Sequence, residues 1–402
     1  MKIFFVNLNP CNTRKINVRQ YKDFIIKSKH ELVENPNDAD IIFVWGCEFR
    51  SDWRDFSFSI SKELKQKHTA KIVYIGCTFD DKYASKIKTE LGVDVIPWRD
   101  GKNLFENILL TKNHKLQDIP LKLAENRLVE SAAEHRKKYP LDNICFEDEY
   151  VKLNICEGCT NNCSYCSERQ MFPRFRSFSE DDLIRDCRAA MEESGTNKVM
   201  FLADSSGQYG VDTGTSLPTL INRLKKEVNN NINVGISQLN PEDFLKYNDQ
   251  MLDLISNGTI TYINIPIQSA SDKILSSMRR HYNYKQIDKL FSDFKSINFN
   301  NFSTHLLFGF PGETDDDVRK TIDFVKKYTP KHVVASAFMT HPSIDASNYS
   351  NTISQEDVKK RINQCDEELT KNGIKVATDW GSITNKIMNR IKSSFNLDLE
   401  NK

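Results

Sequence analysis

The sequence predicts an α/β fold in which an N-terminal parallel-sheet domain is followed by a partial (β/α)6 barrel. Three apolar, β-rich runs near the N-terminus alternate with helix-compatible segments, which is the pattern of a parallel sheet with helical crossovers. Six further runs recur beyond residue 150 at intervals of about 30 to 45 residues, which suits repeated strand-helix units. The length of 402 residues also exceeds an ordinary single core, so two or three domains are expected.

Composition and charge indicate a globular protein without a membrane segment. Hydrophobic residues make up 39% and charged residues 28% of the chain, and no apolar run is long enough to cross a bilayer. No charged-then-apolar leader is seen at the N-terminus, so a cytoplasmic location is expected. The formal net charge of +1 gives no overall attraction to nucleic acid, although a local basic groove would be compatible with it. A cytoplasmic chain keeps its ten cysteines reduced, which favours metal or cluster ligation over disulfides.

The N-terminal domain, expected over residues 1–111, is a flavodoxin-like sheet in which three strands each lead into a cysteine. The runs KIFFVNLNPC, ADIIFVWGC and KIVYIGC end at Cys11, Cys47 and Cys77. Parallel strands present their carboxyl ends at one edge of the sheet, which is where α/β folds bind ligands. The three thiols are therefore expected to converge there.

Residues 112–147 are polar and charged, with too few apolar positions for a core, and they are expected to form a partly helical linker. The tail over residues 343–402 is expected to be a helical extension. Its helix is predicted in SQEDVKKRINQCDEELTKNG, where Ser354 and Asp357 resemble a capping pair and Gly373 a stop.

The barrel is expected over residues 148–342. In such a fold the functional groups lie at the carboxyl ends of the strands. The candidate strands are residues 151–155, 198–203, 232–237, 260–267, 302–308 and 332–339.

The first barrel strand leads into a C-x-x-x-C-x-x-C motif formed by Cys159, Cys163 and Cys166. Thiolates this close in sequence can bind one iron-sulfur cluster, and three ligands leave one iron of a four-iron cluster open to another molecule. With Cys156 as a fourth ligand, the same segment would instead make a zinc site. Both interpretations are open at this point.

This spacing, with Tyr165 before the last cysteine and a barrel around it, resembles the radical S-adenosylmethionine (radical SAM) superfamily. The N-terminal triplet narrows the resemblance to the methylthiotransferases, whose auxiliary cluster has three such ligands. Three barrel segments are similar to blocks of that family: LADSSGQYGVD (202–212), NIPIQSASDKILSSMRR (264–280) and LLFGFPGETDDD (306–317).

The resemblance implies two 4Fe-4S clusters, one on Cys159, Cys163 and Cys166 and an auxiliary one on the N-terminal triplet. S-adenosyl-L-methionine would bind the open iron of the first cluster, and an external donor such as flavodoxin or ferredoxin would supply electrons. The implied reaction places a methylthio group on an unactivated carbon. Candidate catalytic residues are Asp204 and Gln268, and candidate cofactor-binding residues are Tyr165, Ser206, Ser237, Gln238, Ser269, His305 and Gly309.

Several positions depart from the family pattern. Phe172 and Pro173 replace the usual Arg-Gly, Gly235 replaces an arginine of the third strand, and His305 replaces an aspartate. After residue 375 the sequence shows no counterpart of the small β-barrel that usually binds RNA or protein in this family.

The substrate indicated by these blocks is a peptide or protein side chain rather than transfer RNA. DSSGQYGVD and SDKILSSMRR are closer to the branch that modifies an aspartate of a ribosomal protein. Residues 268–270, Gln-Ser-Ala, are nearer the transfer-RNA branches, so transfer RNA is the alternative.

Two other functions stay open. One is a radical SAM enzyme that forms a different bond and uses the auxiliary cluster for electron transfer. The other is a non-catalytic iron-sulfur redox or sensor protein. The remaining cysteines are expected to be buried structural residues: Cys145, Cys156, Cys187 and Cys365.

Overall fold

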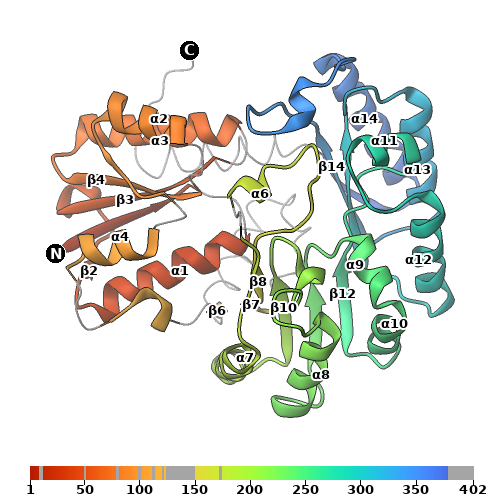
Figure 1. Cartoon of the computed structure of the whole chain (residues 1–402), viewed down its shortest axis with the longest axis horizontal. Coiled ribbons are helices and arrows are strands. Elements are labelled where there is room, and N and C mark those ends of the chain that lie inside the picture. The colour runs from red at the N-terminus through yellow and green to blue at the C-terminus, as the bar shows by residue number, and fades with distance from the viewer. Residues whose placement is uncertain are drawn as a thin grey trace. The chain divides into compact units, whose positions relative to one another are not determined.

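The computed structural model describes residues 1–8, 12–48, 51–77, 81–97, 101–110, 114–119, 122–123, 150–171 and 174–378. They form two compact units, one mainly within residues 1–121 and the other mainly beyond residue 122 (Figure 1). Cys11, Cys145, Phe172, Pro173 and most of the expected linker lie outside the described residues. No helix in the described part of the chain is long and apolar enough to cross a membrane.

The first unit contains a five-stranded sheet in the order β2-β1-β3-β4-β5, with every pairing parallel. This is the flavodoxin-like order of a doubly wound sheet and confirms the predicted fold class. Its strands are β1 (Lys2–Asn7), β2 (Glu31–Leu32), β3 (Ile41–Cys47), β4 (Lys71–Cys77) and β5 (Asp94–Val95). Its α-helices are α1 (Asn12–Lys27), α2 (Ser51–Lys67), α3 (Asp81–Leu91) and α4 (Gly101–Ile108).

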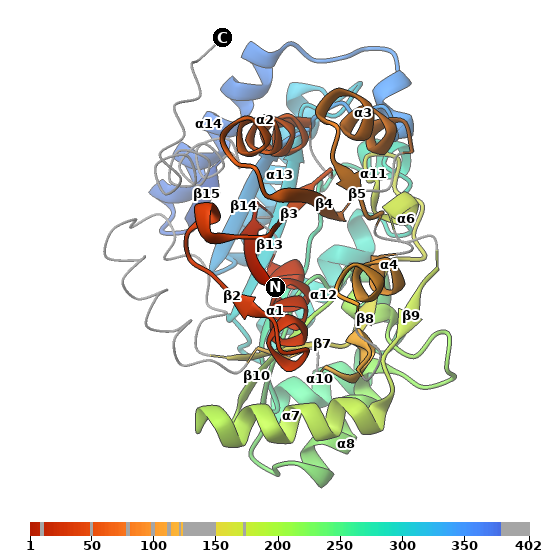
Figure 2. The same ribbon diagram turned by 90° about the vertical axis from the view of Figure 1, so that its left-hand side faces the viewer.

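Helices cover both faces of this sheet, with α2 and α3 on one side and α1 and α4 on the other (Figures 1 and 2). Successive residues of a strand point to opposite faces, so a strand buried on both sides is apolar throughout. In β1, Phe4 and Val6 belong to the core under α2 and α3, whereas Ile3 and Phe5 belong to the core under α1 and α4.

The second unit contains an eight-stranded sheet in the order β15-β14-β13-β12-β11-β10-β7-β6. The six predicted barrel strands are present and run parallel. They are β7 (Val151–Asn154), β10 (Lys198–Leu202), β11 (Asn233–Ile236), β12 (Ile260–Asn264), β13 (Phe302–Phe308) and β14 (His332–Ala337). A separate two-stranded ladder joins β8 (Cys156–Glu157) and β9 (Arg176–Ser177).

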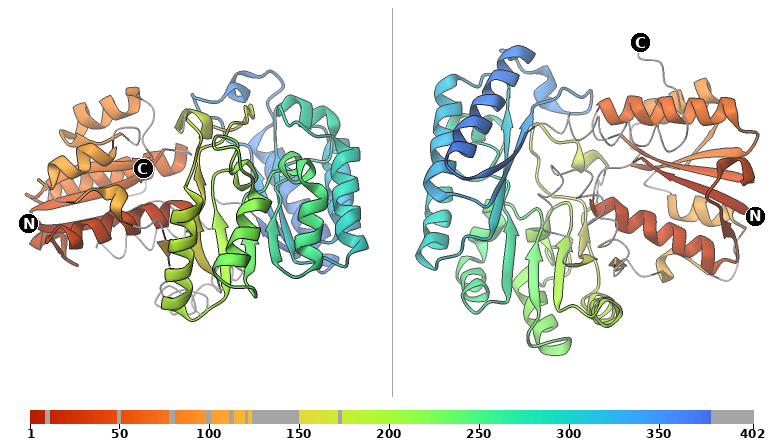
Figure 3. Two further views of the ribbon diagram at one scale, coloured as in Figure 1. Left: turned by 60° about the horizontal axis from the view of Figure 1, so that its bottom comes forward. Right: turned by 180° about the vertical axis from the view of Figure 1, so that it is seen from behind.

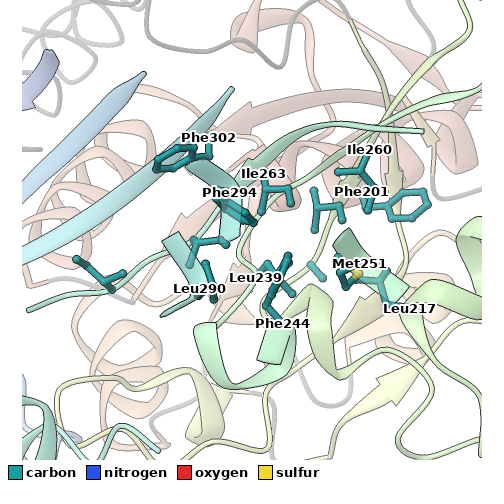
Figure 4. Packing of buried hydrophobic residues seen from close by; sticks show 14 of the residues in the cluster. Phe201, Leu217, Leu239, Phe244, Met251, Ile260, Ile263, Leu290, Phe294 and Phe302 are labelled. Carbon is teal, nitrogen blue, oxygen red and sulfur yellow. The ribbon is translucent and has the colours of Figure 1, made fainter. Parts of the chain in front are cut away.

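Helices follow the strands, and the longer ones lie on the outer side of the sheet (Figure 3). They are α6 (Glu168–Met171), α7 (Glu180–Ser194), α8 (Leu217–Glu227), α9 (Pro241–Lys246), α10 (Asn248–Ser256), α11 (Asp272–Ser277), α12 (Tyr284–Ser296), α13 (Asp315–Tyr328) and α14 (Gln355–Lys371). Aromatic side chains fill the space between helices and strands: the ring centres of Phe244 and Phe294 are 5.2 Å apart, and those of Phe294 and Phe302 are 5.4 Å apart (Figure 4).

Two short strands correct the sequence interpretation. Residues 343–402 were expected to be a helical extension, and α14 is present there, but β15 (Lys375–Thr378) then pairs in parallel with β14 and extends the barrel sheet. Within the expected linker, β6 (Lys122–Leu123) pairs antiparallel with β7. β6 has only two residues, and the residues of β15 are exposed or half-buried, so neither strand shows the apolar run that marks a buried parallel strand.

Candidate functional site

The three cysteines of the C-x-x-x-C-x-x-C motif lie in the loop between β8 and α6, and each is partly exposed. Side chains from the end of β10 hold the start of this loop. The Gly158 amide donates to Asp204 Oδ2 at 2.8 Å, and the Thr160 amide donates to Gln208 Oε1 at 2.8 Å. Asp204 therefore lies at the predicted site, and its described contact is with the cysteine loop.

The second half of the loop is held from the end of α11. The Ser164 amide donates to the Met278 carbonyl at 3.1 Å, and the Ser164 hydroxyl donates to the Ser277 carbonyl at 2.9 Å. A tight turn brings the Cys166 amide to the Cys163 carbonyl at 3.2 Å. The backbone of the motif is thus fixed at both ends by hydrogen bonds.

The thiols of the motif lie near enough to affect one another. Burial, with a smaller contribution from the nearby Cys163 thiolate, raises the pKa of Cys159 to about 12. Burial also raises the pKa of Cys166, as do the charges of Glu168, Cys163 and Cys159. Such thiols lose their protons when bound iron takes up the charge of the thiolates. This donor set fits a four-iron cluster with one iron left open.

The zinc alternative finds no support in the structure. Cys156 is completely buried, and its thiol donates to the Ser205 carbonyl at 3.5 Å. Among the described residues, no three cysteine, histidine or acidic side chains are arranged to hold a single metal ion. A cluster does not require such convergence, since each cysteine binds a different iron.

Two predicted cofactor-binding serines connect neighbouring elements. Ser206 is buried, its hydroxyl donates to the Ser237 carbonyl, and its amide donates to the Gln238 carbonyl at 3.1 Å. These contacts join the ends of β10 and β11. The hydroxyl of Ser269 lies 3.3 Å from the Thr321 hydroxyl on α13, so this buried side chain contacts the helix layer.

Gln268, just beyond the end of β12, pairs with the middle of β13, where His305 lies. Gln268 has a positive φ of 64°, its amide donates to the His305 carbonyl at 2.8 Å, and its carbonyl accepts from the Leu307 amide at 2.9 Å. The His305 ring lies 3.0 Å from the Asn264 amide nitrogen. Burial lowers the pKa of His305 to about 4, so its ring is neutral at pH 7.

Sequence reasoning missed two asparagines at strand ends. Asn154 ends β7 and is completely buried, and neither atom of its amide has a hydrogen-bond partner in the described part of the chain. The amide oxygen of Asn264, at the end of β12, also lacks one. A buried polar atom without a partner is costly, so a bound molecule is a reasonable partner for these amides. The available signal was an asparagine flanked on both sides by apolar residues in the predicted strands 151–155 and 260–267.

Gly309 brings the turn of the GFPGE segment against α14. Its φ is 81°, and a Cβ there would overlap the side chain of Val358. Its amide donates to Glu313 Oε2 at 2.7 Å, and Arg361 donates to the same oxygen at 3.0 Å. Burial raises the pKa of Glu313 to about 7.

In the first unit, two of the three predicted auxiliary ligands are adjacent. Cys47 and Cys77 end β3 and β4 and are direct partners in the sheet register. Both are buried, and the Cys47 amide donates to the Ser57 hydroxyl at 3.3 Å. The register therefore brings these two cysteines side by side at the carboxyl edge of the sheet.

Comparisons with known proteins show similarities over the second unit and over most of the chain. The radical SAM superfamily model matches residues 153–325. The chain is 24% identical over 334 residues to a probable threonylcarbamoyladenosine tRNA methylthiotransferase of Pyrococcus horikoshii, covering 80% of this chain and 73% of that protein. It is 26% identical over 383 residues to a ribosomal protein uS12 methylthiotransferase of Fervidobacterium nodosum, covering 90% and 81%. The chain is 26% identical to the threonylcarbamoyladenosine tRNA methylthiotransferase of Homo sapiens and spans 56% of that protein's length.

A solved structure supports the fold over most of the chain. The radical S-adenosylmethionine methyltransferase TsrM from Kitasatospora setae matches with a TM-score of 0.59 at 12% identity, covering 86% of this chain and 74% of that one. At this level of identity the match concerns the fold alone.

Proposed function

We propose that this chain inserts a methylthio group at an unactivated C–H bond, because residues 153–325 match the radical SAM superfamily model and most of the chain is similar to methylthiotransferases. The observation that carries the proposal is the presence of two separate cysteine groups. One lies in the loop after β8, and the other lies at the paired ends of β3 and β4.

Each cysteine group has a distinct task in this proposal. Cys159, Cys163 and Cys166 would hold the radical SAM cluster, and Cys47 and Cys77, with Cys11, would hold the auxiliary cluster. When bound, the first cluster and S-adenosylmethionine supply reductive cleavage and hydrogen abstraction from carbon. Electrons come from an external donor such as flavodoxin or ferredoxin.

The polypeptide fixes the positions of the reacting groups. Asp204 and Gln208 hold the cysteine loop by its amides at 2.8 Å, so the ligand backbone does not need to reorganise on binding. Asn154 and Asn264, at the ends of β7 and β12, offer neutral hydrogen-bonding groups, and so does His305, beside Asn264 in the middle of β13. A substrate held there is oriented before its hydrogen is removed, which is how such sites gain rate.

The substrate that we favour is a peptide or protein side chain. The match to the ribosomal protein enzyme extends over 90% of this chain, which is more than the 80% matched by the archaeal transfer-RNA enzyme. Transfer RNA is the second candidate, because six of the relatives found carry that substrate in their names.

The deciding experiment measures iron and sulfide in anaerobically reconstituted protein, together with electron paramagnetic resonance. The wild type is expected to hold about eight irons, and a Cys159→Ala, Cys163→Ala, Cys166→Ala variant about four. A Cys47→Ala, Cys77→Ala variant should lose the other four. Cys365→Ala is the control, since this buried thiol on α14 should leave the iron content unchanged. Four irons in the wild type, all lost in the first variant, would remove the auxiliary cluster and the proposal with it.

Product mass then separates the remaining possibilities. A methylthiotransferase adds sulfur and methyl together, whereas a radical SAM enzyme with an electron-transfer cluster would form another bond. Reduced protein is incubated with S-adenosylmethionine and either ribosomal protein or transfer RNA, and the masses of the products are measured by mass spectrometry. Absence of S-adenosylmethionine cleavage after reduction would instead support a redox or sensor protein.

A further inference from the structure

Arg280 is a buried cation beside the cysteine loop. It follows α11 and is only 8% exposed. Its neighbour Arg279 differs: the Arg279 side chain is 38% exposed and forms an ion pair with Asp345 at 2.6 Å. The two arginines therefore occupy contrasting environments at adjacent positions.

All described hydrogen-bond partners of Arg280 are formally neutral side chains or carbonyls in this structure. No carboxylate in the described part of the chain forms an ion pair with it, and the charge of Glu242 acts on it only from a greater distance. Its guanidinium donates to the thiol sulfur of Cys163 at 3.3 Å, the phenol of Tyr165 at 3.4 Å, the amide oxygen of Asn240 at 2.8 Å, the carbonyl of Pro266 at 3.4 Å and the phenol of Tyr282 at 2.9 Å.

Supporting contacts hold the guanidinium in place independently of Cys163. The Tyr282 hydroxyl donates to the Ile267 carbonyl at 2.8 Å, and the Arg280 guanidinium lies 5.0 Å from the centre of the Tyr282 ring. The Asn240 amide donates to the Ser205 hydroxyl at 3.0 Å, which leaves its oxygen directed at Arg280. The cation is thus preorganised toward the sulfur.

A buried charge is costly unless an opposite charge lies close to it. Of the groups that Arg280 contacts, Cys163 becomes anionic when it ligates iron, because the metal-binding form of cysteine is the thiolate. Hydrogen bonds and positive charge at a cluster sulfur stabilise the more negative, reduced cluster.

We propose that Arg280 is a positioning residue that raises the reduction potential of the radical SAM cluster through its hydrogen bond to Cys163. The inference rests on the proposed function, since it requires a cluster on Cys159, Cys163 and Cys166. The step concerned is the uptake of one electron by the oxidised cluster from a flavodoxin- or ferredoxin-type donor. No bond is made or broken in that step.

The test is an electron paramagnetic resonance redox titration of reconstituted full-length protein, with iron content measured on the same samples. Arg280→Gln should disfavour cluster reduction at least tenfold, which for a one-electron couple is a shift of about 59 mV to lower potential. Arg280→Lys keeps the charge and should shift less. Arg279→Gln is the matched control and should keep the wild-type potential.

A second variant tests the inference with the arginine left in place. Asn240→Asp puts a carboxylate where the amide oxygen now lies, 2.8 Å from the guanidinium, and should also lower the potential. If Arg280→Gln does not retain iron, the potential of Asn240→Asp alone tests the role of Arg280. A wild-type potential in Asn240→Asp, or in Arg280→Gln with full iron content, overturns the role of Arg280. A wild type without iron on the motif overturns the proposed function instead.

Discussion

At the scale of single residues, Gly46 shows how closely the sheet is packed beside Cys47. A Cβ at Gly46 would overlap the ring of Tyr74, which is fully buried on the neighbouring strand β4. A buried ring surrounded by core side chains has no free space to move into, so added volume strains the structure. Glycine at this position is therefore a packing requirement of the strand that carries Cys47.

Gly46→Ala should lower the free energy of unfolding by about 2 kcal/mol or more, because it forces Tyr74 out of its position. Urea unfolding followed by circular dichroism measures this change. Combining Gly46→Ala with Tyr74→Val should cost less than the sum of the single changes, because the smaller side chain relieves the overlap. Additive costs in the double variant would mean that the two positions are not coupled.

At the scale of elements, Asp317 connects two helices of the second unit. It closes the capping box at the start of α13 by accepting from the Thr314 amide at 2.9 Å. It also accepts from Ser271, the N-cap of α11, at 2.6 Å and from Lys273 at 3.1 Å. Burial alone would raise the pKa of Asp317, but these hydrogen bonds lower it to about 2.

Asp317→Asn should destabilise the protein by about 1 to 3 kcal/mol, because it removes a charged acceptor shared by two helix starts. The measurement is the urea midpoint at pH 7. Asp316→Asn is the matched control, since the Asp316 side chain is 67% exposed and pairs only within its own helix, with Lys320. A loss of equal size in both variants would contradict a special role for Asp317.

The apolar strands and the position of the cysteine motif after the first barrel strand were predictable from the sequence, whereas partly exposed strands and single buried side chains were not. The strands that carry Cys47 and Cys77 are seven-residue apolar runs, and buried parallel strands have that composition. β15 is as long as β7, but its residues are exposed or half-buried, so it lacks the apolar run that identified the other barrel strands. Arg279 and Arg280 are adjacent residues just after α11. Only tertiary contacts distinguish the buried Arg280 from the exposed Arg279.

At the scale of the whole molecule, buried histidines connect folding to pH. Burial lowers the pKa of His305 to about 4, and burial together with the charges of Lys375 and Lys331 lowers the pKa of His332 to about 4. In the unfolded chain a histidine titrates near about 6.5. Between these two values the unfolded chain binds more protons than the folded protein, so stability falls as the pH is lowered.

This linkage predicts that the two histidines contribute fully to the free energy of unfolding above about pH 6.5. Their contribution is lost progressively as the pH falls toward about 4. The upper limit of the slope is about 1.4 kcal/mol per pH unit for each histidine, and His305, being partly exposed, should contribute less. Urea midpoints measured from pH 7 to pH 4.5 give the slope. His332→Gln should flatten this slope more than His305→Gln, because His332 is fully buried whereas His305 is half-buried. An unaltered slope in both histidine variants would place the acid sensitivity elsewhere in the molecule. Paired carboxylates such as Asp317 would then be responsible, and the contribution of Asp317 is lost only as the pH falls through about 4 to 2.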